Sequence, residues 1–313
     1  MTPNIPSSCR AVVIEKPNAP WAIKEVPVSA PKHGHVLIKV HACGICHSDS
    51  FLQQGAFGGL ASFPRIPGHD GVCKACNRGL FRMCEKGVEN GVTRDGGYAE
   101  YCTLRSEAAV RIPQDADPAE YAPLLCAGVT VFNGIRNMNI VPGDTVAVQG
   151  LGGLGHLAVQ YARKLGYRTI ALSTSSDKKE FAKQLGANEY IDTSKEDAGE
   201  ALQKMGGASL IVVTAPNPDM INPLVNGLGP LGKLLMLAPV GDVQVNTVSL
   251  ISRGASLHGW PSGAALDCEE TIAFAEHQGV KCMVEKFPFD KVEDAVKHME
   301  SGKVRFRSVI VMD

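Results

Sequence analysis

The sequence predicts an α/β protein with a doubly wound parallel sheet and a second, β-rich domain. Three observations support this fold class. Residues 145–166 combine a short apolar strand, a glycine turn and an amphipathic helix. Strand and helix patterns then alternate to about residue 262, which is typical of a parallel sheet. Residues 10–40 instead show short strand patterns broken by prolines, which indicates a β-rich domain.

The glycine turn is a complete G-x-G-x-x-G between a predicted strand and a predicted helix, the context that a dinucleotide-binding motif requires. The glycines permit a tight turn and close backbone approach, and the helix N-terminus offers N–H groups to a pyrophosphate. The residues expected to bind the dinucleotide are Gly150, Gly152, Gly153, Leu154 and Gly155. A strand-to-helix turn without a ligand is the alternative.

Composition excludes several function classes. The 313 residues are 44% hydrophobic and 20% charged, which predicts about two domains with ample core. A net charge of -1 offers no electrostatic footprint for nucleic acid or an anionic membrane surface, and no apolar run is long enough to span a bilayer. Because the N-terminal residues do not have the pattern of a secretory signal, we expect a cytoplasmic protein.

Ten cysteines in a reducing compartment point to metal rather than disulfides. Cys73, Cys76 and Cys84 have the C-x2-C-x7-C spacing of a metal site, with a redox pair or buried thiols as alternatives. Cys46 and Cys126, the latter in a predicted helix over residues 121–134, could join His69 as the three protein ligands of a catalytic zinc. Such a zinc beside a nucleotide fold could polarise an alcohol or carbonyl for hydride transfer.

Five stretches identify a family. GICHSDS, PGH, CKACNRGLFRMC, LLCAGVT and GLGGLG, in this order, resemble zinc-dependent alcohol dehydrogenases of the medium-chain dehydrogenase/reductase superfamily, nearest to the yeast-like and cinnamyl-alcohol-dehydrogenase-like branches. The resemblance implies a GroES-like β-barrel catalytic domain at about 1–127 and 263–313, and a Rossmann domain at about 128–262. It also implies an enzyme that interconverts an alcohol and an aldehyde or ketone with NAD(P), as a homodimer or homotetramer.

The resemblance also implies roles at the metal and the substrate. Cys46, His69 and Cys126 match the catalytic zinc ligands. Ser48 matches the hydroxyl that hydrogen-bonds the substrate oxygen and passes its proton. Asp49 matches a carboxylate that lies beside the zinc.

At the cofactor, Thr130 matches a residue against the nicotinamide ring, and His47 and Arg307 match basic positions near the pyrophosphate. The tip of the predicted strand 168–173 carries no carboxylate, and its hydroxyls with a following ammonium could donate to a 2′-phosphate. These groups belong to Ser173, Thr174, Ser175 and Lys178. They resemble those of NADP-dependent cinnamyl-type members, so we predict NADP(H) over NAD(H). A helix-entry loop without a nucleotide role is the alternative.

The chain departs from the family directly after His69. In relatives several barrel strands separate PGHE from the second metal motif, whereas here PGH runs into DGVCKACNRG, so we predict an internal deletion and a truncated barrel. His69 and Cys73 can be at most ~14 Å apart. Either His69 serves the catalytic zinc, or His69 or Asp70 joins Cys73, Cys76 and Cys84 at a structural zinc; Asp70 stands at the place of the family's first cysteine there.

Two other hypotheses follow. A zinc-free quinone or enoyl reductase of the same superfamily would not need Cys46, Ser48 or Cys126. A non-catalytic nucleotide-binding chain, inactivated by the deletion, would keep one structural zinc. Metal content discriminates the three: about two zinc ions, none, or one without turnover.

Overall fold

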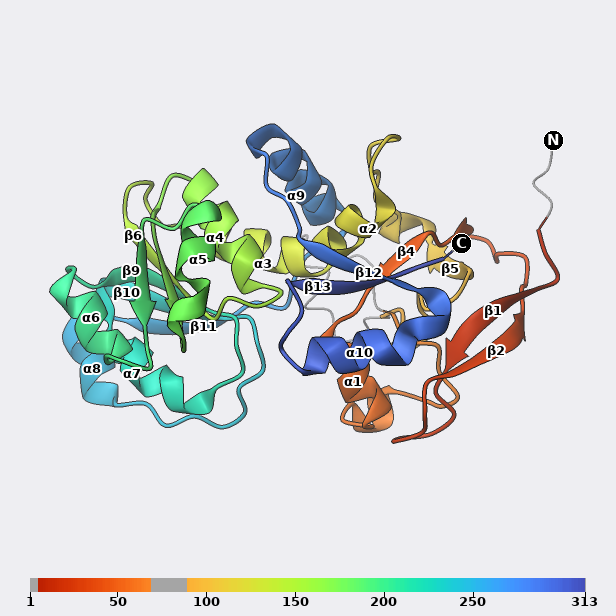
Figure 1. Ribbon diagram of the computed structural model, residues 1–313, viewed down its shortest axis with the longest axis horizontal. Helices are drawn as coiled ribbons and strands as arrows, with labels where there is room; N and C mark the ends of the chain where they lie inside the picture. Colours follow the sequence, from red (N-terminus) through yellow and green to blue (C-terminus); the bar gives the residue numbers. More distant parts are fainter. Residues whose placement is uncertain (1–4, 69–88, 313) are drawn as a thin grey trace. The chain divides into compact units, whose positions relative to one another are not determined.

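A computed structural model describes residues 5–68 and 89–312 (Figure 1). The chain forms two compact units. The first comprises Met1–Cys126, Gly263–Ala273 and Cys282–Asp313, and the second comprises Ala127–Ser262 and Phe274–Lys281. The domain limits given above stay a prediction. Among the described residues, none of the helices is long and apolar enough to cross a membrane.

The second unit contains a six-stranded sheet in the order β11-β10-β9-β6-β7-β8, with every neighbouring pair parallel. Its strands are β6 (Thr145–Gln149), β7 (Arg168–Ser173), β8 (Glu189–Asp192), β9 (Ala208–Val213), β10 (Leu228–Met236) and β11 (Ser256–Gly259). The chain winds outward from β6 to β8 and then back past β6 to β11. The predicted doubly wound parallel sheet is therefore confirmed.

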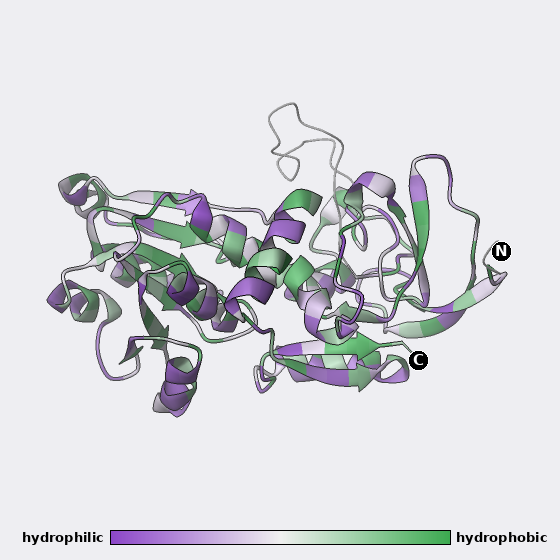
Figure 2. Ribbon diagram, turned by 90° about the horizontal axis from the view of Figure 1, so that it is seen from above, coloured by the Kyte–Doolittle hydropathy of each residue, from purple (hydrophilic) through white to green (hydrophobic). Residues whose placement is uncertain are grey.

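One helix precedes the first strand of this sheet, and the other five each follow one of its strands. They are α3 (Ala127–Arg136), α4 (Gly155–Lys164), α5 (Lys179–Gln184), α6 (Ala198–Lys204), α7 (Ile221–Asn226) and α8 (Thr247–Arg253). The central strands are continuously apolar, as in Leu210–Val213, where no side chain is exposed. Such runs are typical of strands covered on both faces. Figure 2 shows hydrophobic central strands and helices that carry hydrophilic residues.

The first unit is built from short sheets. β1 (Ser8–Val13) pairs with β2 (Ala22–Pro27), and β3 (His35–Lys39) pairs with β5 (Tyr101–Arg105), both antiparallel. A third sheet has the order β12-β13-β4, formed by Val284–Pro288, Arg307–Val311 and Ala42–Gly44. The half-buried strand predicted around HVLIK is confirmed as β3.

Helices and turns complete the described chain. The remaining helices are α1 (His47–Gln53), α2 (Pro118–Tyr121), α9 (Ala265–Gln278) and α10 (Val292–Glu300). Short 3-10 turns lie at Gly58–Leu60, Ser106–Ala108, Ala122–Leu125, Ser176–Lys178, Pro218–Met220 and Phe289–Lys291. The core of the first unit brings together side chains from β1, β4, β13 and α10, including Val12, Cys43, Val296 and Ile310. This core holds β4 and β13 side by side and so fixes the segment from which α1 begins.

Candidate functional site

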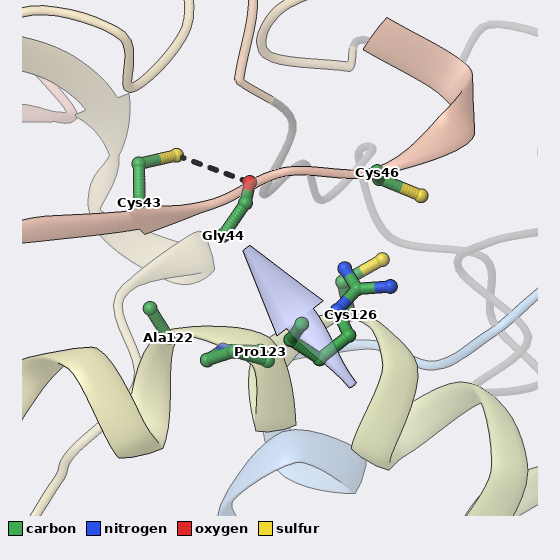
Figure 3. Close-up of a pocket in the computed structure, with 7 residues that line it drawn as sticks. Cys43, Gly44, Cys46, Ala122, Pro123 and Cys126 are labelled. Carbon is green, nitrogen blue, oxygen red and sulfur yellow. Dashed lines mark hydrogen bonds between the residues drawn. The ribbon is translucent and has the colours of Figure 1, made fainter. Parts of the chain in front are cut away.

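Cys46 and Cys126 line the same pocket of the first unit (Figure 3). Cys46 is the extended residue between β4 and α1, with φ -123° and ψ 157°. Cys126 follows the 3-10 turn Ala122–Leu125, and its φ of -123° and ψ of -75° leave the helical region. The continuous helix predicted over 121–134 is therefore wrong at this residue. The pocket is lined by Cys43, Gly44, Cys46, Ala122, Pro123, Cys126 and Arg307.

In Figure 3 the Sγ atoms of Cys46 and Cys126 both extend toward the right of the view. The third cysteine of the pocket does not join them. The Sγ of Cys43 donates to the Gly44 carbonyl at 3.8 Å, and Cys43 is 5% exposed. The pocket therefore offers two sulfurs, from Cys46 and Cys126, to a shared ligand.

A buried cation accompanies these sulfurs. Arg307 begins β13 and is only 5% exposed. Burial alone would lower the pKa of its guanidinium, but the sulfurs of Cys46, Cys126 and Cys282, with a hydrogen bond to Cys46, outweigh burial and raise that pKa. Within the described residues, the Nε of Arg307 has no hydrogen-bond partner. A neighbouring guanidinium favours the thiolate form that zinc requires, so the donor set fits a thiolate-bound metal.

Asp49 ties the pocket to two other segments. Its carboxylate is 2% exposed, and its Oδ2 accepts the Cys46 N–H at 2.9 Å and the Tyr98 hydroxyl at 2.9 Å. Its Oδ1 accepts the Gly68 N–H at 3.2 Å. A buried carboxylate requires such donors, because it cannot be solvated. The sequence singled out Asp49, but nothing in it indicated Tyr98, which lies 49 residues away along the chain.

Gly68, the last residue of the described segment 5–68, lies where two backbone segments cross closely. Its φ is +93°, and a Cβ there would lie 2.7 Å from the Tyr98 ring and 2.8 Å from the Gly97 nitrogen. Gly97 donates its N–H to the Gly68 carbonyl at 3.0 Å, and Tyr98 donates its N–H to the Pro67 carbonyl at 3.0 Å. A side chain at position 68 would clash with these neighbours, so the position requires glycine. The two hydrogen bonds hold the crossing segments together.

The remaining predicted ligands lie outside the described residues. These are His69, Asp70, Cys73, Cys76 and Cys84. Within residues 5–68 and 89–312, no group of three or more His, Cys, Asp or Glu side chains could hold a metal ion. The described part of the chain thus brings together two of the three predicted catalytic zinc ligands.

Two further residues with predicted roles lie on α1. His47 and Ser48 are its first two residues, the former exposed and the latter half-buried. Thr130, on α3 in the second unit, donates from Oγ1 to the Ser262 hydroxyl at 2.9 Å. The Nδ2 of Asn133 donates to the Ser262 carbonyl at 3.0 Å. The roles implied for His47, Ser48 and Thr130 stay predictions.

The glycine turn has the geometry of a phosphate-binding turn. Gly150 has φ +91° and donates its N–H to the Leu172 carbonyl at 2.9 Å. A Cβ on Gly155 would lie 1.8 Å from the Gly150 oxygen, whereas a Cβ on Gly152 would meet nothing within 4 Å. Gly153 and Leu154 close the turn before α4 begins. The turn is thus tight at its base and open at Gly152, where a ligand could approach the backbone.

The loop after β7 carries the hydroxyls predicted at the ribose. Ser173 is buried, Ser175 is half-buried and Thr174 is exposed. Lys178 donates from Nζ to the Leu151 carbonyl at 3.1 Å, which ties this loop to the glycine turn. Lys178 and the glycine turn therefore lie together at the carboxyl edge of the sheet, where α/β proteins bind ligands.

Asp192 is a residue at this edge that the sequence interpretation missed. It ends β8 and pairs in register with Ser173. Its carboxylate accepts the Ser194 hydroxyl at 2.6 Å and the Ser176 hydroxyl at 2.7 Å, and the Lys195 Nζ lies 3.3 Å away. These hydrogen bonds, from Ser194 first, lower the pKa of Asp192 below its usual range. Because parallel neighbours end at one edge, the predicted strand EYIDT was a usable signal for it.

Comparison with known proteins identifies the family. Residues 153–277 match the zinc-binding dehydrogenase family, and residues 32–74 match the alcohol dehydrogenase GroES-like domain. The chain is 50% identical to alcohol dehydrogenase patD of Penicillium expansum over 100% of both chains, and 31% identical to an alcohol dehydrogenase of Geobacillus stearothermophilus over 97% of this chain and 100% of that one. A cinnamyl alcohol dehydrogenase structure from Sorghum bicolor has 27% identity and a TM-score of 0.86, with 97% of each chain covered.

This chain therefore belongs to the zinc-dependent alcohol dehydrogenases of the medium-chain dehydrogenase/reductase superfamily. The predicted combination of a Rossmann domain with a GroES-like domain is confirmed, as is the prediction of an NAD(P)-dependent alcohol dehydrogenase acting between alcohol and carbonyl. The alignment with the Penicillium relative is 342 positions long, so about 29 of its positions have no counterpart among the 313 residues here. Their placement after His69 stays a prediction.

Proposed function

We propose that this chain is a zinc-dependent alcohol dehydrogenase that prefers NADP(H), with Cys46, His69 and Cys126 as its catalytic zinc ligands. One observation carries the proposal. Two thiols that are 80 residues apart in the sequence line one pocket beside the buried Arg307 guanidinium. A neighbouring guanidinium favours the thiolate form in which cysteine binds zinc.

Covalent geometry favours His69 as the third ligand. The N–H groups of Gly68 and Cys46 both donate to the carboxylate of Asp49. The Cα of the next residue can lie only about 3.8 Å from that of Gly68. His69 is therefore proposed to serve the catalytic site. Asp70, Cys73, Cys76 and Cys84 are then proposed to hold the structural zinc.

The proposed domain limits assign the metal ligands to one domain and the glycine turn to the other. The catalytic domain comprises about residues 1–127 and 263–313, and the nucleotide domain about residues 128–262. The open approach at Gly152 and the tight base at Gly155 support dinucleotide binding by the glycine turn. The residues proposed to bind the dinucleotide there are Gly150, Gly152, Gly153, Leu154 and Gly155.

Preference for NADP(H) is supported by charge at the carboxyl edge of β7 and β8. The tip of β7 carries hydroxyls and no carboxylate. The one carboxylate that ends the neighbouring strand, Asp192, is engaged by Ser176, Ser194 and Lys195. The ammonium of Lys178 lies beside the glycine turn. A 2′-phosphate would therefore meet donors and cations, whereas the carboxylate that selects a ribose hydroxyl is missing from the β7 tip.

When bound, zinc supplies a Lewis acid for the alcohol or carbonyl oxygen, and the nicotinamide takes up or gives the hydride. The chain supplies the rest. Ser48 would hydrogen-bond the substrate oxygen and relay its proton during oxidation, releasing its own proton as it accepts that of the substrate, and Asp49 holds the Cys46 N–H in place. From the family resemblance, Thr130 would contact the bound nicotinamide, and His47 and Arg307 would lie near its pyrophosphate. A homodimer or homotetramer and a cytoplasmic location are proposed from the family resemblance alone.

The test combines zinc analysis with NADPH oxidation over a panel of aldehydes. Wild-type protein should contain about two zinc ions per chain and reduce at least one aldehyde. Cys46→Ser and Cys126→Ser should each lose one zinc and at least about 1,000-fold in kcat/KM, because several kcal/mol of transition-state stabilisation are removed. Cys9→Ser, at a buried cysteine of β1, is the matched control and should keep both.

The remaining outcomes count against the proposal. One zinc per chain without turnover would indicate an inactivated nucleotide-binding chain. Turnover without zinc would indicate a quinone or enoyl reductase.

A further inference from the structure

Tyr98 has a polar contact that no motif of the chain explains. Its side chain is 0% exposed, and its hydroxyl donates to the Oδ2 of Asp49 at 2.9 Å. Burial, and then the nearby charge of Asp49, raise the pKa of Tyr98 well above its usual value. The hydroxyl therefore remains a hydrogen-bond donor at every pH at which the enzyme would work.

The position of this hydroxyl is determined by the surrounding backbone and core. Tyr98 donates its N–H to the Pro67 carbonyl at 3.0 Å, and its carbonyl accepts the Val12 N–H at 2.8 Å. Its ring packs in the core with Val12 and lies 6.2 Å from the Trp21 ring, centroid to centroid. A ring held in this way presents its hydroxyl at one place, so it can fix the group that accepts from it.

Asp49 links the Tyr98 hydroxyl to the pocket by hydrogen bonds. Its Oδ2 receives the Tyr98 hydroxyl and the Cys46 N–H together, and its Oδ1 receives the Gly68 N–H. Tyr98, Cys46 and Gly68 come from three segments separated in the sequence. Loss of the hydroxyl would leave one oxygen of a buried carboxylate with one donor fewer, so the orientation of the carboxylate would be less constrained.

We infer that Tyr98 is a positioning residue of the metal site, which fixes Asp49 and through it the backbone of Cys46 and Gly68. The inference rests on the proposed function, because it presupposes that Cys46 binds a metal. Mutation of a group that orients a metal ligand through a hydrogen bond typically lowers metal affinity by about 10- to 100-fold.

Tyr98→Phe tests the inference, since it removes only the hydroxyl and keeps the ring in the core. The full chain is titrated with zinc in competition with a chromophoric chelator, and its cobalt form is followed by thiolate-to-metal absorbance. Tyr98→Phe should weaken binding at the site that Cys46→Ser abolishes by about 10-fold or more. Tyr167→Phe removes a buried hydroxyl that donates to the Ile140 carbonyl at 3.3 Å, and it should leave zinc affinity within about twofold.

A double-mutant cycle separates positioning from general stability. If Tyr98 acts through Asp49, Tyr98→Phe should cause no further loss of affinity in an Asp49→Ala background, where the hydroxyl has no side-chain oxygen of residue 49 to donate to. Additive losses, or equal zinc affinity of Tyr98→Phe and the wild type, would overturn the inference. If Cys46→Ser shows the same cobalt–thiolate absorbance as the wild type, Cys46 does not bind the metal. The proposed function is then wrong, and the inference about Tyr98 falls with it.

Discussion

The glycine turn and the cysteine pocket are built in opposite ways. The turn, the strand before it and the helix after it come from one stretch of 22 residues, 145–166. The pocket and its supports come from segments as far apart as Cys46, Tyr98, Cys126 and Arg307. The turn needs only local backbone geometry, whereas the pocket needs several distant segments to pack correctly. A change far from the chemistry should therefore harm the pocket more than the turn.

The two regions also depend on different forces. At the turn, steric exclusion decides which residues fit, since the Gly155 position lies almost against the Gly150 oxygen. In the pocket, buried charges decide, since Asp49 and Arg307 are both nearly inaccessible to water and must find partners within the protein. The contrast can be tested by changes that act on one force at a time.

The largest effect is expected within the glycine turn. Gly155→Ala should lower the free energy of unfolding by about 3 kcal/mol, because its Cβ would overlap the Gly150 oxygen. Gly152→Ala meets open space and should change the free energy of unfolding by less than about 0.5 kcal/mol, yet weaken NADPH binding about tenfold by blocking close approach. Urea unfolding and NADPH fluorescence titration measure both. Equal destabilisation by the two variants would contradict steric control of the turn.

A titration tests the buried surroundings of Arg307, behind the pocket. Burial raises the pKa of Cys282, a neighbour of Arg307, from 9.0 to about 12. The folded chain then holds a proton that the unfolded chain releases above pH 9. This thiol's contribution to stability is therefore complete below pH 9 and is lost as the pH rises towards 12, by about 1.4 kcal/mol per pH unit. Between pH 8 and 10.5, the wild type should lose about 2 kcal/mol more than Cys282→Ala in urea unfolding. A parallel decline of both proteins would show that Cys282 does not titrate as described.

The smallest effect is expected for Lys178→Met, which removes the hydrogen bond between the loop after β7 and the glycine turn. Loss of the ammonium should raise the KM for NADPH about tenfold and leave the KM for NADH nearly unchanged, because only the former carries a 2′-phosphate. Lys183→Met, on the exposed side of α5 beside Glu180, is the control. Steady-state kinetics with both cofactors give the ratio. An equal rise in KM for NADPH and NADH would mean that Lys178 supports the glycine turn and does not recognise the 2′-phosphate.

The pattern of the chain allowed much of the second unit to be predicted. Continuous apolar strands, alternating helices and the glycine turn are local features, and each was observed close to its predicted place. In the first unit the pattern predicted which residue types bind metal, but not their surroundings. The helix predicted over residues 121–134 fails at Cys126 because the backbone there turns out of the helical region.

Spacing and residue type were enough to predict the family, the doubly wound sheet, the glycine turn and the two thiols that line the pocket. Tertiary packing, by contrast, brings Tyr98 and the N–H groups of Cys46 and Gly68 to Asp49 and buries Arg307 beside two sulfurs. The physical reason is that a buried charge is stabilised by whichever groups packing brings to it, and sequence separation carries no record of those neighbours.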